Sequence, residues 1–302
     1  MDLIQEIKRL KKEKNAVILA HFYQEKEIQD IADYLGDSLK LAQIAMNTDA
    51  EIIVFCGVHF MAETAKILNP QKKVLLPVLK AGCKMADMIS PIALKRYKEE
   101  HPNTKIITYV NSTASVKALS DCICTSTNAL KIIDYYLNKG DQILYCPDQN
   151  LGNYAMEQSG KKFDVWPGCC PIHHFLDRNK IIAMKKKYPN ALLISHPECK
   201  LDILEISDFV GSTKQMLDYT IQSDCEEFIV CTEKGVIHAM EKASPNKKFY
   251  LASSTLSCSN MKYTTLEDVY QCLNEEANEI FVDETIATKA KIALDKMLEL
   301  SK

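Results

Sequence analysis

Three evenly spaced cysteines are the residues of this chain best suited to chemistry. Cys83, Cys170 and Cys258 are separated by 87 and 88 residues. Each cysteine follows a short apolar run that is typical of a strand, with a few loop residues in between. A chain that repeats one unit three times, and supplies one thiol per unit, can bring three thiols to a common centre.

Polar triplets recur with the same period as the cysteines. Residues 21–23, 109–111 and 196–198 each follow an apolar strand-like run, and the triplets start 88 and 87 residues apart. Alternation along an extended chain places the first and third residue of a triplet on one side. These pairs are His21 with Tyr23, Tyr109 with Asn111, and His196 with Glu198. A single histidine is more often structural, but this set at equivalent strand ends favours acid–base and hydrogen-bonding roles.

A serine follows each triplet by 16 or 17 residues and precedes a helix-like run. We predict that Ser38, Ser126 and Ser212 are helix N-caps, with Thr213 directly after the third. Capping alone would be a structural role. A helix N-terminus also offers free N–H groups and the positive end of the helix dipole, which suit carboxylate or phosphate. Three such ends around one cavity would hold a polyanionic substrate without a basic patch.

Strands and helices alternate within each repeat, which sets the predicted fold class. The pattern predicts an α/β fold of three α/β/α sandwich domains with small parallel sheets, related by a pseudo-threefold axis around a central active site. The predicted domains are residues 1–87, 88–174 and 175–302, the last including a C-terminal helix over residues 283–300. Functional groups in such units collect beyond the carboxyl ends of the strands. The triplets, serines and cysteines all occupy such positions in the sequence.

Composition excludes several classes of protein. The chain has 302 residues, is 47% apolar and 25% charged, and carries a net charge of −3, which gives no reason to expect nucleic acid or an anionic membrane as a partner. Apolar runs fall short of the roughly 18 residues that a membrane span needs. The first residues resemble an amphipathic helix and not an export signal, so we expect a cytoplasmic protein whose twelve cysteines remain thiols.

Three equivalent cysteines leave three interpretations open. A structural zinc site prefers four ligands, often in local CxxC pairs, and Cys122 with Cys124 or Cys169 with Cys170 has the wrong spacing. Three cysteines suit a 4Fe-4S cluster whose fourth iron is open to act as a Lewis acid. A zinc site with an open position and a purely structural role are the other two interpretations.

The motifs together resemble the quinolinate synthase family, and the resemblance runs from about residue 18 to residue 262. It implies a three-domain pseudo-threefold fold with a central 4Fe-4S cluster. It also implies condensation of iminoaspartate (iminosuccinate) with dihydroxyacetone phosphate to quinolinate, with release of phosphate and water, in de novo NAD biosynthesis. Transient supply of iminoaspartate by an aspartate-oxidising enzyme fits this reaction. The motifs are His21-Phe22-Tyr23, Gly36-Asp37-Ser38, Tyr109-Val110-Asn111, Cys124-Thr125-Ser126, Cys170-Pro171-Ile172-His173, His196-Pro197-Glu198, Gly211-Ser212-Thr213 and Cys258-Ser259-Asn260.

The resemblance also implies roles for individual residues. It identifies Cys83, Cys170 and Cys258 as the cluster ligands. The implied catalytic residues are His21, Tyr23, Tyr109, His196 and Glu198. The implied substrate-binding residues are His21, Ser38, Tyr109, Val110, Asn111, Ser126, His173, His196, Pro197, Glu198, Ser212 and Thr213.

One departure from the family pattern and two rival functions remain. Some longer members of the family carry a CxxCxxC run at the last ligand, whereas the residues three positions on either side of Cys258 are Thr255 and Met261 here, so we expect no disulfide switch in this loop. The enzymatic rival is another 4Fe-4S hydro-lyase that acts on a small polyanion. A non-catalytic iron–sulfur sensor is the second rival, but such a protein would need neither the triplets nor the three anion-binding helix ends.

Overall fold

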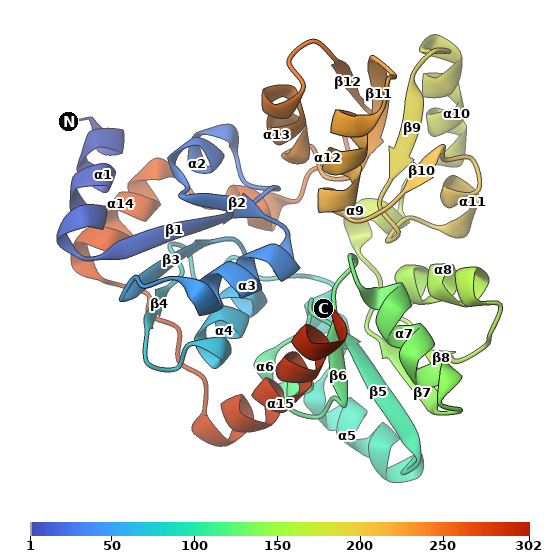
Figure 1. Ribbon diagram of the computed structural model, residues 1–302, viewed down its shortest axis with the longest axis horizontal. Coiled ribbons are helices and arrows are strands. Elements are labelled where there is room, and N and C mark those ends of the chain that lie inside the picture. The colour runs from blue at the N-terminus through green and yellow to red at the C-terminus, as the bar shows by residue number, and fades with distance from the viewer. Residues whose placement is uncertain (1) are drawn as a thin grey trace.

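The computed structural model describes residues 2–302 and contains three parallel sheets of four strands each, with helices between the strands (Figure 1). The strand orders are β2-β1-β3-β4, β6-β5-β7-β8 and β10-β9-β11-β12, so the same topology occurs three times. The α/β fold predicted from the repeat is confirmed. Each sheet lies within one predicted range, while the domain limits themselves stay a prediction.

The first unit contains the N-terminal helix and the first sheet. Its elements are α1 (Leu3–Glu13), β1 (Ala16–His21), α2 (Lys26–Ile31), β2 (Tyr34–Gly36), α3 (Ser38–Asn47), β3 (Ile52–Cys56), α4 (His59–Leu68), β4 (Lys73–Leu75) and the short 3-10 helix η1 (Ala86–Met88). The central strands β1 and β3 are almost wholly buried and apolar. This is the pattern expected of parallel strands that are covered on both faces.

The second and third units repeat this order. The second has α5 (Pro91–Glu100), β5 (Thr104–Tyr109), α6 (Ala114–Lys117), β6 (Cys122–Cys124), α7 (Ala129–Asn138), β7 (Gln142–Cys146), α8 (Gln149–Ser159), β8 (Asp164–Val165) and α9 (Pro171–His174). The third has α10 (Arg178–Lys187), β9 (Leu192–Ser195), α11 (Leu201–Leu204), β10 (Phe209–Val210), α12 (Thr213–Gln222), β11 (Glu227–Cys231), α13 (Val236–Ala243), β12 (Lys248–Leu251) and the 3-10 helix η2 (Ser259–Lys262).

An aspartate fixes the first strand of every unit in the same way. The carboxylate of each aspartate accepts the backbone N–H of a residue in that strand, at 2.7 to 2.9 Å. The pairs are Asp33 with Ile18, Asp121 with Ile106, and Asp208 with Leu193. The aspartates are 88 and 87 residues apart, so the repeat extends to individual hydrogen bonds.

The predicted N-caps are correct for one serine and wrong for two. Ser212 caps α12 with a full capping box that involves Gln215. Asp37 caps α3, so Ser38 is its first helical residue, and Asn128 precedes α7, so Ser126 lies two residues before that cap. Aspartate and asparagine are N-caps as good as serine, and the preference therefore could not select between neighbouring residues.

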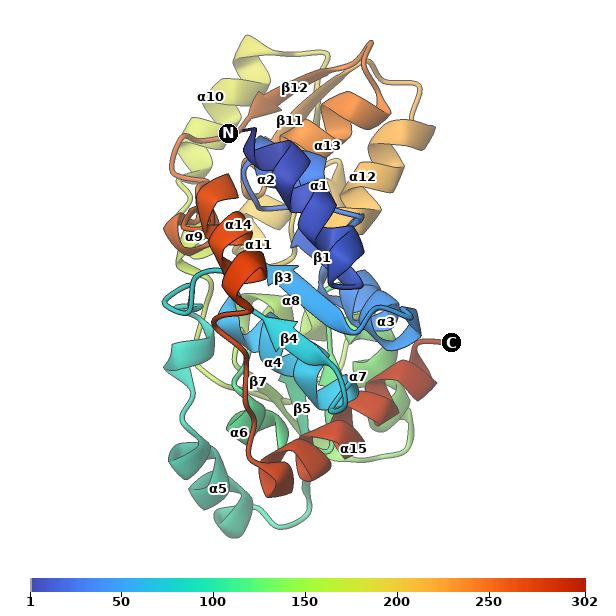
Figure 2. The same ribbon diagram turned by 90° about the vertical axis from the view of Figure 1, so that its left-hand side faces the viewer.

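The C-terminal segment returns to the first two units. Helix α14 (Leu266–Glu275) packs against α1, and α15 (Glu284–Leu300) lies against α4, α6 and β6 (Figure 2). Ala290, Ala293, Leu294 and Met297 of α15 join one apolar core that is continuous through the first and second units. The third unit has two further apolar clusters, and one of them includes Phe22 of the first unit. Its junction with the first unit is therefore partly apolar.

None of the helices formed by residues 2–302 has both the length and the apolar character that crossing a membrane requires.

Candidate active site

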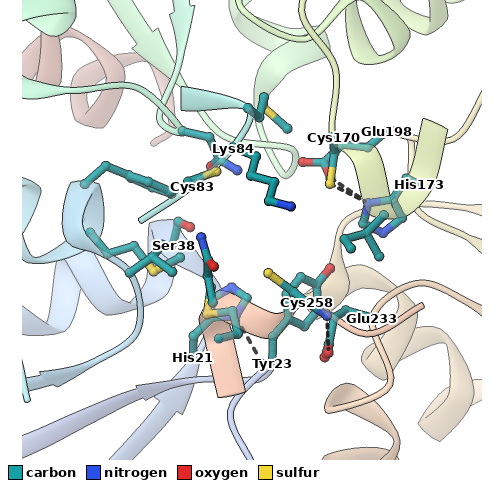
Figure 3. Close-up of a pocket in the computed structure, with 18 of the residues that line it drawn as sticks. His21, Tyr23, Ser38, Cys83, Lys84, Cys170, His173, Glu198, Glu233 and Cys258 are labelled. Carbon is teal, nitrogen blue, oxygen red and sulfur yellow. Dashed lines mark hydrogen bonds and ion pairs between the residues drawn. The ribbon is translucent and has the colours of Figure 1, made fainter. Parts of the chain in front are cut away.

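The carboxyl ends of the strands meet at a central cavity between the three units (Figure 3). Most residues predicted for the site line it, and the three exceptions are Val110, Pro197 and Ser212. The predicted residues that line it are His21, Tyr23, Ser38, Cys83, Tyr109, Asn111, Ser126, Cys170, His173, His196, Glu198, Thr213 and Cys258. The structure thus brings together residues from nine separate segments of the chain, as the repeat predicts.

The carboxylate of Glu198 contacts two other side chains of the cavity, one through each oxygen. Tyr109 Oη donates to Glu198 Oε1 at 2.7 Å, and His173 Nδ1 lies 2.8 Å from Glu198 Oε2. Burial by itself raises the pKa of Glu198, but neighbouring His196, His173 and Tyr109 stabilise the charged form and give a net lowering of the pKa. The carboxylate is therefore ionised and can accept a proton.

His21 and His196 occupy equivalent positions and share one tautomer. The N–H of Tyr23 donates to His21 Nδ1 at 3.1 Å, and the N–H of Glu198 donates to His196 Nδ1 at 3.3 Å. Because Nδ1 is the acceptor in each ring, the neutral ring carries its proton on Nε2. Burial lowers the pKa of His21 to about 3 and that of His196 to about 4, so both rings are neutral near pH 7. Each offers an N–H donor to a ligand.

Tyr23 and Tyr109 remain protonated. Tyr23 Oη lies 2.9 Å from Thr213 Oγ1 and 2.8 Å from Thr232 Oγ1, which connects the first unit to the third. Burial, followed by the charge of Glu198, raises the pKa of both phenols well above the usual value. The tyrosines are hydrogen-bond donors and weak acids, and Glu198 is the ionised group beside them.

Three cysteines, one from each unit, face the same cavity (Figure 3). Cys83 lies in the loop after β4, Cys170 immediately precedes α9, and Cys258 immediately precedes η2. All twelve cysteines are free thiols, as predicted, and these three are partly exposed. Among the described residues that line the cavity there is no fourth cysteine.

The donor atoms fit soft-metal chemistry. Burial raises the pKa of Cys83 to about 12 and also raises the pKa of Cys170 and Cys258, so metal binding must displace protons. The tightest group of potential ligands is Cys170, His173 and Glu198, whose donor atoms lie within 4.8 Å of one another. Cys83 and Cys258 stand outside this group. Thiols that surround a cavity without touching one another are what a multi-iron cluster requires, because the metal ions and sulfides lie between them.

Helix N-termini from all three units meet beside the cavity. Ser38 begins α3, Thr213 begins α12, and Ser126 precedes α7, and all three line the cavity. Thr127 Oγ1 donates to Asp37 Oδ2 at 2.8 Å and lies 2.9 Å from Ser212 Oγ. Ser212 therefore acts beside the cavity and not in its lining.

Several polar residues that line the cavity are absent from the predicted set of site residues. These include Asp37, Lys84, Glu233 and Asn260. Lys84 follows Cys83 directly, extends into the cavity and is the only lysine among the described lining residues, which include no arginine. The position of Lys84 directly after the predicted cluster ligand Cys83 is the sequence signal that could have identified it. Glu233 is buried and ion-paired with Lys262 at 3.2 Å, which nothing in the local sequence indicated.

Comparisons with known proteins agree along the whole chain. The family model described as quinolinate synthetase A protein matches residues 5–299. The quinolinate synthase of Chloroherpeton thalassium is 50% identical over 308 residues, which cover 100% of this chain and 95% of the relative. That of Alkaliphilus metalliredigens is 51% identical over 300 residues, covering 99% and 98%, and that of a Synechocystis species is 49% identical over 305 residues, covering 99% and 96%.

Proposed function

The chain belongs to the quinolinate synthase family, and from this premise we propose that it condenses iminoaspartate with dihydroxyacetone phosphate to form quinolinate, phosphate and water. Its relatives are named for an enzyme of NAD biosynthesis. They support this reading and not the alternative, another 4Fe-4S hydro-lyase. The observation that carries the proposal is the convergence of one cysteine and one polar triplet from each unit on a single cavity.

The proposed cofactor is a 4Fe-4S cluster held by Cys83, Cys170 and Cys258. The three thiols fit it because they come from three sides of the cavity and no fourth cysteine lines it among the described residues. When bound, such a cluster would supply a Lewis-acidic iron that assists loss of water. His173 Nδ1 lies 3.2 Å from Cys170 Sγ and would keep that ligand oriented.

The protein's own groups would bind the substrates and move protons. Helix N-termini at Ser38 and Thr213, together with Ser126, would hold carboxylate and phosphate groups. The ionised carboxylate of Glu198 would accept a proton during isomerisation and ring closure, and Tyr23 and Tyr109 would donate hydrogen bonds. The neutral rings of His21 and His196 would donate from Nε2.

Product formation under anaerobic conditions tests the proposal. The protein with its cluster intact is supplied with iminoaspartate generated in situ and dihydroxyacetone phosphate, and quinolinate is measured chromatographically. We expect quinolinate from the wild type and none from Cys258→Ser. Absence of product from a preparation with full iron and sulfide would overturn the assignment. A cytoplasmic location and supply of iminoaspartate by an aspartate-oxidising enzyme are parts of the proposal that need separate tests.

A further inference from the structure

Two buried carboxylates bind the backbone of two of the three cavity cysteines. Asp148 Oδ2 accepts the N–H of Cys170 at 3.0 Å, and Glu233 Oε1 accepts the N–H of Cys258 at 3.0 Å. Asp148 follows Cys146, the last residue of β7, by two positions, and Glu233 follows Cys231, the last residue of β11, by two positions. The two contacts are therefore equivalent in the repeat, although one residue is aspartate and the other glutamate.

Each carboxylate joins its cysteine to the segment that follows the strand. Asp148 is fully buried, and its Oδ1 also accepts the N–H of Leu151 as the N-cap of α8, at 2.8 Å. Glu233 is 1% exposed, and its Oε2 accepts the N–H of Gly235 at 2.7 Å. A carboxyl group with one oxygen on the N–H of the cysteine and the other on the N–H of an adjacent turn fixes both segments at once.

The first unit lacks this contact. The equivalent residue, two positions after Cys56, is Val58, which has no polar side-chain atom. The loop before Cys83 is held from other sides: Asn260 Nδ2 donates to Gly82 O at 2.8 Å, and the N–H of His59 donates to Ala81 O at 2.7 Å. The carboxylate contact is thus a specific property of the second and third units and not a requirement of the fold.

The loop that carries Cys170 also fits tightly against its strand. Gly168 forms a parallel bridge with Asp148, and a Cβ atom at Gly168 would lie 2.6 Å from the carbonyl oxygen of Pro147. Such a contact is closer than packed atoms permit. Backbone pairing and the Asp148 carboxylate therefore constrain the same short segment, and together they determine where the Cys170 thiol lies.

We propose that Asp148 and Glu233 are positioning residues, which hold Cys170 and Cys258 for an iron–sulfur cluster. The inference rests on the proposed function insofar as the cluster is its ligand. Mutation of a residue that hydrogen-bonds to a metal ligand and orients it typically lowers the metal affinity by about 10-fold to 100-fold. We expect a variant that lacks either carboxyl group to stay folded and to lose the cluster faster than the wild type.

Cluster release from the anaerobically reconstituted full chain tests the proposal. Iron appearing in a ferrous chelator is followed for Asp148→Ala and Glu233→Ala, and we expect release about 10-fold faster than in the wild type. Asp121→Ala and Asp208→Ala are matched controls, because each removes a carboxylate that binds a backbone N–H within the first strand of the same unit. Glu233→Asp keeps a carboxylate and should restore slow release at least in part.

Release rates equal to those of the control variants would overturn the proposal. Hydrogen–deuterium exchange of the full chain without metal gives a second readout that does not depend on the cluster. Asp148→Ala should speed exchange in residues 168–172 and leave residues 256–260 unchanged, and Glu233→Ala should do the reverse. Unchanged exchange would contradict the positioning role. A wild-type chain that assembles no cluster would instead contradict the proposed cofactor.

Discussion

At the scale of single residues, the proposed proton transfer depends on Glu198. Its carboxylate is ionised, whereas burial keeps Tyr23 and Tyr109 protonated. We expect Glu198→Gln to lower kcat by roughly 10²-fold or more, the usual contribution of a general base, because the amide keeps the shape but cannot accept the proton. Steady-state quinolinate formation measures this effect. Normal turnover in Glu198→Gln would remove Glu198 from the mechanism.

Among the described residues that line the cavity, Lys84 is the one lysine or arginine, and we expect it to attract anionic substrates. It extends into a cavity that also contains Glu198, Glu233 and Asp37 among its described lining residues. Lys84→Met keeps the length of the side chain and removes its charge, so we expect KM for dihydroxyacetone phosphate to rise about tenfold, as for loss of one charged hydrogen bond.

The charge, and not the length, of Lys84 is the property under test. Lys84→Arg should retain most of the affinity, and the exposed Lys12→Met on α1 should leave KM unchanged. Added salt should raise KM in the wild type more than in Lys84→Met, since screening weakens only the charged contact. Equal KM values for wild type and Lys84→Met would exclude a binding role.

Which residues meet in the cavity could be predicted because the repeat fixes both position and direction. The first and third residue of every triplet line the cavity, whereas the middle residues Val110 and Pro197 do not, although the triplets lie at the strand ends and in the turns that follow them. Glu233 could not be found in this way. Its partners, the N–H of Cys258 and the ammonium of Lys262, are 25 and 29 residues away and meet it only in the folded chain.

At the scale of elements, the junction of three helix N-termini depends on Thr127. Its hydroxyl contacts the caps of α3 and α12, which belong to the first and third units. Thr127→Val keeps the shape of the side chain but leaves buried Asp37 without this donor. We expect the free energy of unfolding to fall by about 1–3 kcal/mol, the cost of an unsatisfied buried group. Urea denaturation measures the change.

A serine at position 127 separates the hydroxyl from the methyl group. Thr127→Ser should keep most of the stability, because its hydroxyl can reach the same partners. Thr288→Val removes an exposed hydroxyl from α15 and should change stability by less than about 0.5 kcal/mol. If Thr127→Val is no less stable than Thr288→Val, the three helix ends are held by their other contacts.

Local sequence signals could not predict the exact start of α3 or the packing of α14. Asp37 and Ser38 are adjacent, and both are good N-caps, so the sequence could place the start of α3 only to within a residue. The packing of α14 on α1 was also beyond a local signal. It depends on buried residues from both ends of the chain, Ile7 and Leu10 with Val269 and Leu273, which become neighbours only after the sheets have formed.

At the scale of the whole molecule, the cavity makes folding sensitive to acid. His21 and His196 are buried where the three units meet, and burial lowers their pKa from 6.5 to about 3 and about 4. An unfolded chain binds protons at these rings below about pH 6.5, and the folded protein does not. The contribution of these two histidines to the free energy of unfolding is therefore fully present above that pH. It declines as the pH falls, by about 1.4 kcal/mol per pH unit for each histidine.

Urea denaturation of the metal-free protein at about pH 7 and about pH 5 measures this decline. The double variant His21→Gln, His196→Gln should lose less stability over this interval than the wild type, because neither glutamine titrates. His101→Gln removes an exposed histidine on the second unit and should leave the pH dependence as it is in the wild type. A double variant whose stability falls as steeply as that of the wild type would show that other groups cause the acid sensitivity, and that the cavity tolerates charged histidines.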